Sequence, residues 1–99
     1  MKTGAVNVIE VLAVSGQSQD LRAPIDRLLQ TLGEVPGCLS YQAVRSLADA
    51  DLWIITGYWE STAAMRAHFA HPALNDLERL LDCRAVKRVA ASSFTASQV

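Results

Sequence analysis

The sequence lacks three features that mark large classes of proteins. No apolar run approaches the roughly 20 residues of a membrane-spanning helix, and the first residues lack the apolar core of a secretory signal. The formal net charge is −1, with acidic and basic residues interspersed, so nothing indicates binding to nucleic acid or to an anionic membrane surface. We therefore expect a cytoplasmic protein that binds neither nucleic acid nor membranes.

Cysteine is also scarce. Cys38 and Cys83 are the only two thiols, and neither belongs to a C-x-x-C pair or has a histidine or aspartate nearby at metal-ligand spacing. In a cytosolic chain, isolated cysteines are usually reduced and pack as small hydrophobic side chains. We therefore expect no metal site, and a disulfide or a catalytic thiol is disfavoured.

The chain does contain enough apolar sequence for one folded unit. It has 99 residues, of which 51% are hydrophobic and 19% are charged, as in an ordinary globular protein. There is no internal repeat, no linker and no low-complexity segment. Residues 1–99 are therefore expected to form a single domain.

The most informative stretch runs from residue 52 to residue 71. Leu52–Trp59 is short and rich in β-favouring residues, which predicts a strand, and Gly57 leaves room for a ring or a ligand on the face that carries Trp53 and Trp59. Ser61 is a good N-cap for a helix that Pro72 ends at about residue 71. A strand that feeds directly into a helix suggests a pocket between the two.

The remaining periodicities complete an α+β order. Strands are expected at residues 5–14, 38–47 and 84–93, and a short amphipathic helix is expected after Pro72. The first long helix is expected to begin near Pro24, with Ser18 or Asp20 as a possible cap. Its apolar face consists of Leu21, Ile25, Leu28, Leu29 and Leu32.

This order, β-α-β-β-α-β, is that of a ferredoxin-like fold, with both helical segments on one face of a four-stranded antiparallel sheet. The first and third strands are apolar on both sides, so the other face of the sheet is expected to be covered as well. We therefore expect two copies to pack sheet against sheet as a homodimer.

With these elements in place, the chain resembles the antibiotic biosynthesis monooxygenase family of dimeric α+β barrels. The resemblance lies in residues 36–41 (PGCLSY), 58–61 (YWES) and 64–69 (AMRAHF), and it extends over roughly residues 5–94. It implies a small oxygenase that works without flavin, metal or haem and uses dioxygen to oxidise electron-rich aromatic compounds, such as anthrones or quinols. We accordingly expect no cofactor.

The resemblance also points to particular residues. Trp59 matches the tryptophan that lines the substrate pocket of the polyketide oxygenases, and Arg79 lies near a family arginine. Asn7 matches an asparagine of the haem-degrading branch, but His68 and Glu78 stand where that branch has a tryptophan and an axial histidine, which argues against haem degradation. The chain departs from the polyketide oxygenases as well, with Ile55 in place of an asparagine and Met65 in place of a tyrosine.

The side chains themselves suggest roles beside structural alternatives. His68 is the best candidate base, because histidine titrates near neutral pH, and it shares a helix face with Met65. Tyr41 or Asn7 is suited to stabilise an oxyanion. Met65, Phe69, Trp53 and Trp59 are suited to line an apolar substrate pocket. Each of these residues has the alternative of ordinary core packing.

Three functions remain open at this point. The first is a cofactor-independent monooxygenase for a phenol, anthrone or quinol, with His68 as base. The second is a module that binds or senses a hydrophobic metabolite without chemistry. The third is an isomerase or another accessory enzyme on the same scaffold, and the fold alone does not choose among them.

Overall fold

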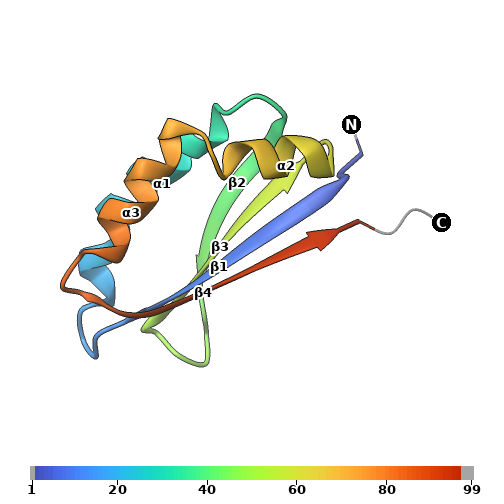
Figure 1. Cartoon of the computed structure of the whole chain (residues 1–99). Coiled ribbons are helices and arrows are strands. Elements are labelled where there is room, and N and C mark those ends of the chain that lie inside the picture. The colour runs from blue at the N-terminus through green and yellow to red at the C-terminus, as the bar shows by residue number, and fades with distance from the viewer. Residues whose placement is uncertain (1, 97–99) are drawn as a thin grey trace.

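The computed structural model describes residues 2–96 and shows helices packed on one side of a single antiparallel sheet (Figure 1). In chain order the elements are β1 (Ala5–Ala13), the 3-10 helix η1 (Ser18–Leu21), α1 (Arg22–Gly33), β2 (Cys38–Arg45), β3 (Leu52–Trp59), α2 (Thr62–His68), the 3-10 helix η2 (Pro72–Leu74), α3 (Asn75–Leu81) and β4 (Val86–Thr95). The predicted ferredoxin-like α+β fold is confirmed, with its second helical segment divided into α2, η2 and α3.

The sheet has the strand order β2-β3-β1-β4. Because β1 lies in the middle, its pairing aligns the ends of the other strands: Ala5 stands opposite both Trp59 and Thr95. Further along, Asn7 stands opposite Gly57, and Gly57 stands opposite Tyr41 on the other side. One row of the sheet therefore joins three of the positions selected from the sequence.

The face of the sheet under the helices carries the core. Alternate residues of β1 and β3 are buried on this face, as the period of a strand requires. The fully buried aliphatic side chains are Val11, Leu21, Ile25, Leu28, Leu32, Ile55 and Leu80. Burial of each such side chain contributes about 1.5–3 kcal/mol, so this layer is the main source of stability.

The first helix begins differently from the prediction. Ser18 and Asp20 belong to η1, and α1 starts at Arg22 without a side-chain cap. Ser18 instead accepts a hydrogen bond from the Trp53 indole, with its Oγ 3.0 Å from Nε1, which explains why it does not cap the helix. Pro24 lies in the first turn of α1, where a missing backbone N–H costs nothing.

Several strand ends also differ from the prediction: β1 ends one residue early, at Ala13, and β4 extends two residues further, to Thr95. β2 ends at Arg45 because the Ser46 hydroxyl accepts hydrogen bonds from the N–H groups of Ala48 and Asp49 and begins a turn. β4 starts at Val86 because a turn, closed by the Val86 N–H to the Cys83 carbonyl, occupies the preceding residues. Sequence periodicity identifies the strands but not such local turn bonds.

Candidate functional site

Four of the residues selected from the sequence meet at the end of the sheet that α2 covers. Asn7 comes from β1, Tyr41 from β2, Trp59 from β3 and His68 from α2. All four are buried, His68 and Trp59 almost completely. Ser61 positions the helix that carries His68, because its Oγ accepts the Ala64 N–H at 3.0 Å as an N-cap. We call these four residues the polar cluster.

Gly57 makes the polar cluster possible. A Cβ at this position would collide with the Asn7 amide oxygen and would lie 2.5 Å from Cε2 of Tyr41. The absence of a side chain therefore leaves space that the Asn7 amide and the Tyr41 ring fill. The room expected beside Gly57 for a ring or a ligand is thus filled by side chains of the protein itself, and none of it is left for a ligand.

The hydrogen bonds of the polar cluster run in one direction. The Trp59 indole can only donate, so Asn7 turns its amide oxygen toward Nε1 at 2.8 Å and its amide nitrogen toward the Tyr41 oxygen at 2.7 Å. The Tyr41 oxygen accepts that bond, which leaves its proton free to point at Nε2 of His68, 3.5 Å away. No other orientation of the Asn7 amide satisfies both neighbours.

His68 ends this chain of bonds in a defined tautomer. Its Nδ1 lies against the Met65 carbonyl oxygen, which can only accept, so Nδ1 carries the proton of the neutral ring. Nε2 is then an unprotonated acceptor facing Tyr41. The ring packs against those of Trp59 and Phe69, with centroid distances of 4.2 Å and 4.4 Å. His68 therefore presents a hydrogen-bond acceptor to the Tyr41 hydroxyl.

Burial keeps both titratable members uncharged. It raises the pKa of Tyr41 to about 12, against a smaller opposing effect of the hydrogen bond from Asn7. It lowers the pKa of His68 below its ordinary value of 6.5, while the hydrogen bond to the Met65 carbonyl opposes part of that change. A neutral imidazole with a free Nε2 is able to take up a proton at neutral pH.

A cavity of about 180 Å³ lies next to the polar cluster. Its lining comes from α2 and the end of β4 and consists of Thr62, Met65, Arg66, Phe69, Ser93, Phe94 and Thr95. Phe69 connects it to His68 through the ring contact described above, and Ser93 is paired with Asn7 across the strands. We call this space the α2 cavity.

The sequence predicted only part of the α2 cavity. Met65 and Phe69 line it, as expected for pocket residues, but Arg66, Ser93 and Phe94 were not selected. Ser93 is the last residue of the predicted strand and Phe94 follows it, and only the pairing of β4 with β1 brings this part of the chain beside α2. Knowledge of that strand pairing is the signal that would have found them.

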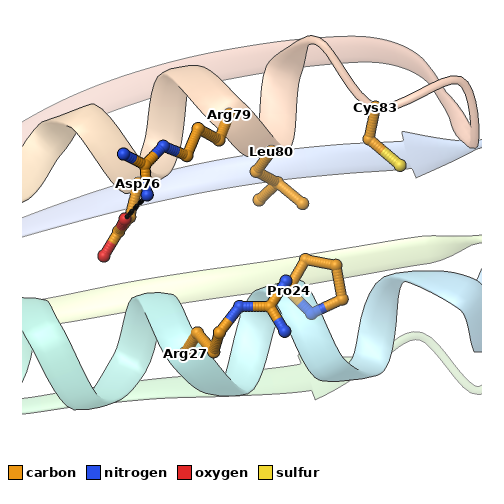
Figure 2. Close-up of a pocket in the computed structure, with 6 residues that line it drawn as sticks. All are labelled: Pro24, Arg27, Asp76, Arg79, Leu80 and Cys83. Carbon is orange, nitrogen blue, oxygen red and sulfur yellow. Dashed lines mark hydrogen bonds and ion pairs between the residues drawn. The ribbon is translucent and has the colours of Figure 1, made fainter.

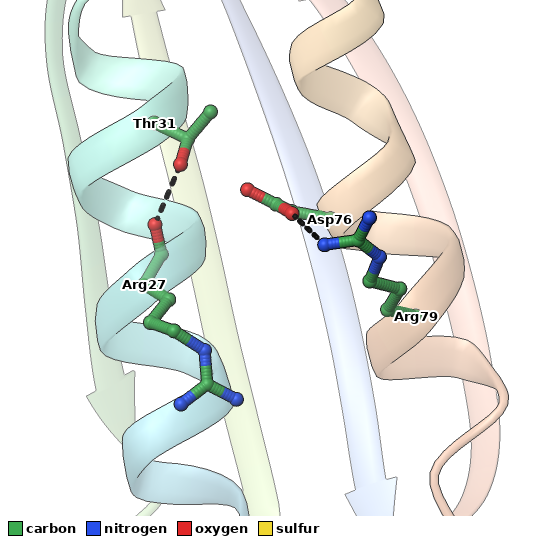
Figure 3. A network of polar contacts seen from close by, with 4 residues as sticks. All are labelled: Arg27, Thr31, Asp76 and Arg79. Carbon is green, nitrogen blue, oxygen red and sulfur yellow. Dashed lines mark hydrogen bonds and ion pairs between the residues drawn. The ribbon is translucent and has the colours of Figure 1, made fainter.

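Two other selected residues lie apart from the polar cluster. Trp53 is buried near the opposite end of β3, roughly 20 Å from Trp59 at about 3.3 Å per residue of strand, and donates to Ser18. Arg79 lies on α3, in a separate groove with Asp76, with which it forms an ion pair (Figures 2 and 3).

Within residues 2–96, no group of three or more histidine, cysteine, aspartate or glutamate side chains has the arrangement of a metal site. Cys38 and Cys83 are free thiols, both half-buried. Over the same residues, no helix is long and apolar enough to cross a membrane. The polar cluster itself offers amide, phenol, indole and imidazole groups.

Comparison with solved structures shows how widely this fold occurs. PA3566 from Pseudomonas aeruginosa superposes with a TM-score of 0.79 at 18% identity, over 99% of this chain and 98% of the other. A putative antibiotic biosynthesis monooxygenase from Deinococcus radiodurans gives a TM-score of 0.76 at 22% identity, over 96% and 94%. SnoaB from Streptomyces nogalater, a cofactor-independent oxygenase, gives 0.76 at 18% identity, over 97% and 96%.

No curated protein sequence matches the chain. The family model for antibiotic biosynthesis monooxygenases, in contrast, matches residues 5–79, from the first residue of β1 into α3. That stretch contains Asn7, Tyr41, Trp59 and His68, the whole polar cluster. The chain therefore belongs to the antibiotic biosynthesis monooxygenase family.

Proposed function

We propose that the protein is a cofactor-independent monooxygenase that oxidises a small electron-rich aromatic compound, such as a phenol, an anthrone or a quinol, with dioxygen. The observation that carries this proposal is the one-directional hydrogen-bond chain from Trp59 to His68, which ends in an unprotonated Nε2. Membership in the monooxygenase family and the likeness to an oxygenase that needs no cofactor support the same class of reaction.

The proposed reaction starts with proton removal from the substrate. The substrate proton passes to the Tyr41 oxygen as the Tyr41 proton moves to Nε2 of His68, so Tyr41 ends unchanged and His68 becomes charged. Direct formation of a tyrosinate is disfavoured, because the pKa of Tyr41 is raised to about 12. Asn7 donates its amide N–H to the Tyr41 oxygen at 2.7 Å and so steadies the partial negative charge that this oxygen carries while the two protons move.

The deprotonated aromatic is electron-rich enough to reduce dioxygen itself. In an anthrone, the methylene carbon becomes a carbonyl, one oxygen atom remains in the product and the other leaves as water, so the substrate supplies all the electrons. Exclusion of water protects the reactive intermediates during this step. The burial of the polar cluster is suited to that requirement.

The α2 cavity is the proposed binding site for the aromatic ring. Met65 and Phe69 offer an apolar and an aromatic surface, and Phe69 stacks directly on His68. Phe69 is 48% exposed, which leaves its ring free to contact a substrate. Trp59 belongs to the polar cluster and does not line the α2 cavity. Trp53 and Arg79 have no place in this site.

A homodimer is part of the same proposal. One face of the sheet carries no helices (Figure 1). The half-buried apolar side chains of β1 and β3 alternate with the core residues and therefore lie on this face. Val44 and Phe94, 58% and 54% exposed, lie on it as well, because they are paired with Ile54 and Val6. A second copy is the natural cover for such a face. Sedimentation that shows a stable monomer at micromolar concentration would overturn this point.

We also propose a cytoplasmic location, which suits two free thiols.

A second candidate function follows if the polar cluster is purely structural. Every buried side-chain nitrogen and oxygen in the described residues has a hydrogen-bond partner, and the polar cluster is closed over by its own members. Such a satisfied network is also what a purely structural core requires. In that case the α2 cavity holds a hydrophobic metabolite without chemistry, as in a binding or sensing module.

Oxygen uptake with a panel of anthrones and quinols tests the proposal. The wild type is compared with His68→Ala, with Tyr41→Phe and with His71→Ala, the matched control, because His71 is exposed and caps η2. We expect protein-dependent uptake that falls by about 10²–10⁴-fold in the first two variants and is unchanged in the third. A reaction without protein measures spontaneous oxidation, and uptake no faster than this across the panel favours the binding module.

A further inference from the structure

A second groove lies between α1 and α3, away from the polar cluster (Figure 2). Its volume is about 330 Å³, and it is lined by Pro24 and Arg27 of α1 and by Asp76, Arg79, Leu80 and Cys83. Side chains from both helices point into the space between them. The volume falls within the range of about 300–1,000 Å³ typical of small-molecule sites.

The groove carries a net positive charge. Arg79 Nη1 lies 3.3 Å from Asp76 Oδ1, and this is the single ion pair among residues 2–96 (Figure 3). Arg27 has no ion-pair partner in that range, since Thr31 bonds to its backbone carbonyl and not to its guanidinium. Two cations and one carboxylate leave one positive charge, which matches a monoanion.

The rest of the lining is apolar. Leu80 is buried at the base of the groove, the Pro24 ring lies on the α1 side, and the half-buried Cys83 thiol lies near the end of α3. An arginine beside an apolar surface suits a ligand with both a charged and an apolar part. Arginine in particular binds carboxylates through two parallel N–H bonds.

We infer that the groove between α1 and α3 binds a small organic monocarboxylate with a compact apolar body. The carboxylate is bound by Arg27, with Arg79 adding charge, and the apolar body packs on Leu80 and Pro24. The Arg79–Asp76 pair is exposed on the Arg79 side and is weak, so it does not prevent this binding. The family resemblance had placed Arg79 with the aromatic substrate, and this inference assigns it to a different ligand. Binding at the groove does not depend on oxygenase activity.

Nuclear magnetic resonance titration of the full chain tests this inference. The probe is cyclohexanecarboxylate, and the comparison compound is cyclohexylmethanol, which has a similar shape and no charge. We expect amide shifts centred on Arg27, Asp76 and Leu80 with the carboxylate, and at least tenfold weaker binding of the alcohol. Shifts centred on the α2 cavity, equal binding of the two compounds, or no shift at millimolar carboxylate would overturn the inference.

Three variants sharpen the test, and each changes a surface residue that is not needed for folding. Arg27→Gln is expected to weaken carboxylate binding at least fivefold. Asp76→Asn is expected to strengthen it several-fold, because the repelling charge is removed. Arg88→Gln, on β4 outside the groove, serves as the matched control and is expected to leave the affinity unchanged. A loss of affinity with Asp76→Asn, or equal losses with Arg27→Gln and Arg88→Gln, would contradict binding at this groove.

Discussion

The polar cluster under α2 and the groove between α1 and α3 differ in how their polar groups are satisfied. Under α2, the side chains of the polar cluster bond to one another and to a backbone carbonyl, and all are neutral. Between α1 and α3, the polar groups are charged, face water and leave one guanidinium without an ion-pair partner among residues 2–96. The polar cluster is closed by its own members, and the groove is open to solvent.

Because of this difference, substitutions in the polar cluster and in the groove should have different energetic effects. A buried donor or acceptor that loses its partner costs about 1–3 kcal/mol, because no water replaces the lost bond. An exposed ion pair contributes about 0–1 kcal/mol, because water replaces it readily. Substitutions in the polar cluster should therefore affect folding and chemistry together, whereas substitutions in the groove should affect ligand binding alone.

The largest expected effect is that of Asn7→Leu. Leucine has a similar size but leaves the Trp59 N–H and one acceptor site of the Tyr41 oxygen unpaired. We expect a loss of about 2–5 kcal/mol in the free energy of unfolding, measured by urea denaturation. Asn75→Leu, at an exposed asparagine on α3, is the control and should change stability by about 0.5 kcal/mol or less. A cost below about 1 kcal/mol for Asn7→Leu would show that the polar cluster is not closed to water.

Gly57→Ala is expected to have the next largest effect. The added methyl group collides with the Asn7 amide and the Tyr41 ring, both of which are fixed by hydrogen bonds. We expect about 1–3 kcal/mol of destabilisation and a lower melting temperature. Gly33→Ala is the matched control, because a methyl group there meets nothing within 4 Å, and it should be neutral or stabilising. If both variants melt alike, the space beside Gly57 is not filled as described.

The fold was predictable because its signals are local and repeated. Alternate burial along Leu52–Trp59, the cap at Ser61 and the leucines of the first helix each specify an element, and together they give the β-α-β-β-α-β order. The start of α1 was not predictable in the same way. Ser18 has the chemistry of a cap, and its actual partner, Trp53, is distant in sequence and is found only in the folded chain.

The site was predictable in part for the same reason. His68 and Met65 share a helix face by spacing alone, and the structure buries both. The bonds that orient His68, however, depend on the pairing of β1, β2 and β3, because Asn7 reaches Tyr41 across Gly57. A sequence does not specify which side chain fills the space of a glycine. The chemical roles given to these residues stay predictions until activity is measured.

The pH dependence of stability distinguishes the two regions further. Burial lowers the pKa of folded His68, so below its ordinary pKa of 6.5 the unfolded chain takes up a proton that the folded chain does not. Stability should therefore fall as pH decreases from 6.5 through the pKa of folded His68, and any oxygenase rate should fall as His68 becomes protonated. Urea midpoints from about pH 7.5 to about pH 5 test this, with His68→Gln as the variant that lacks the dependence. An unchanged slope in His68→Gln would assign the effect to another group.

The smallest effect on folding is expected from Asp76→Asn, although the same change should strengthen carboxylate binding. Its partner Arg79 is 81% exposed, so loss of the ion pair should cost a few tenths of a kcal/mol, in keeping with exposed pairs. Urea denaturation of Asp76→Asn beside Arg79→Gln and the double variant measures the coupling between the two residues. A coupling above about 1 kcal/mol would mean that the ion pair holds α3 in place. The groove would then be a structural feature like the polar cluster. The contrast between a closed polar cluster and an open groove would fail.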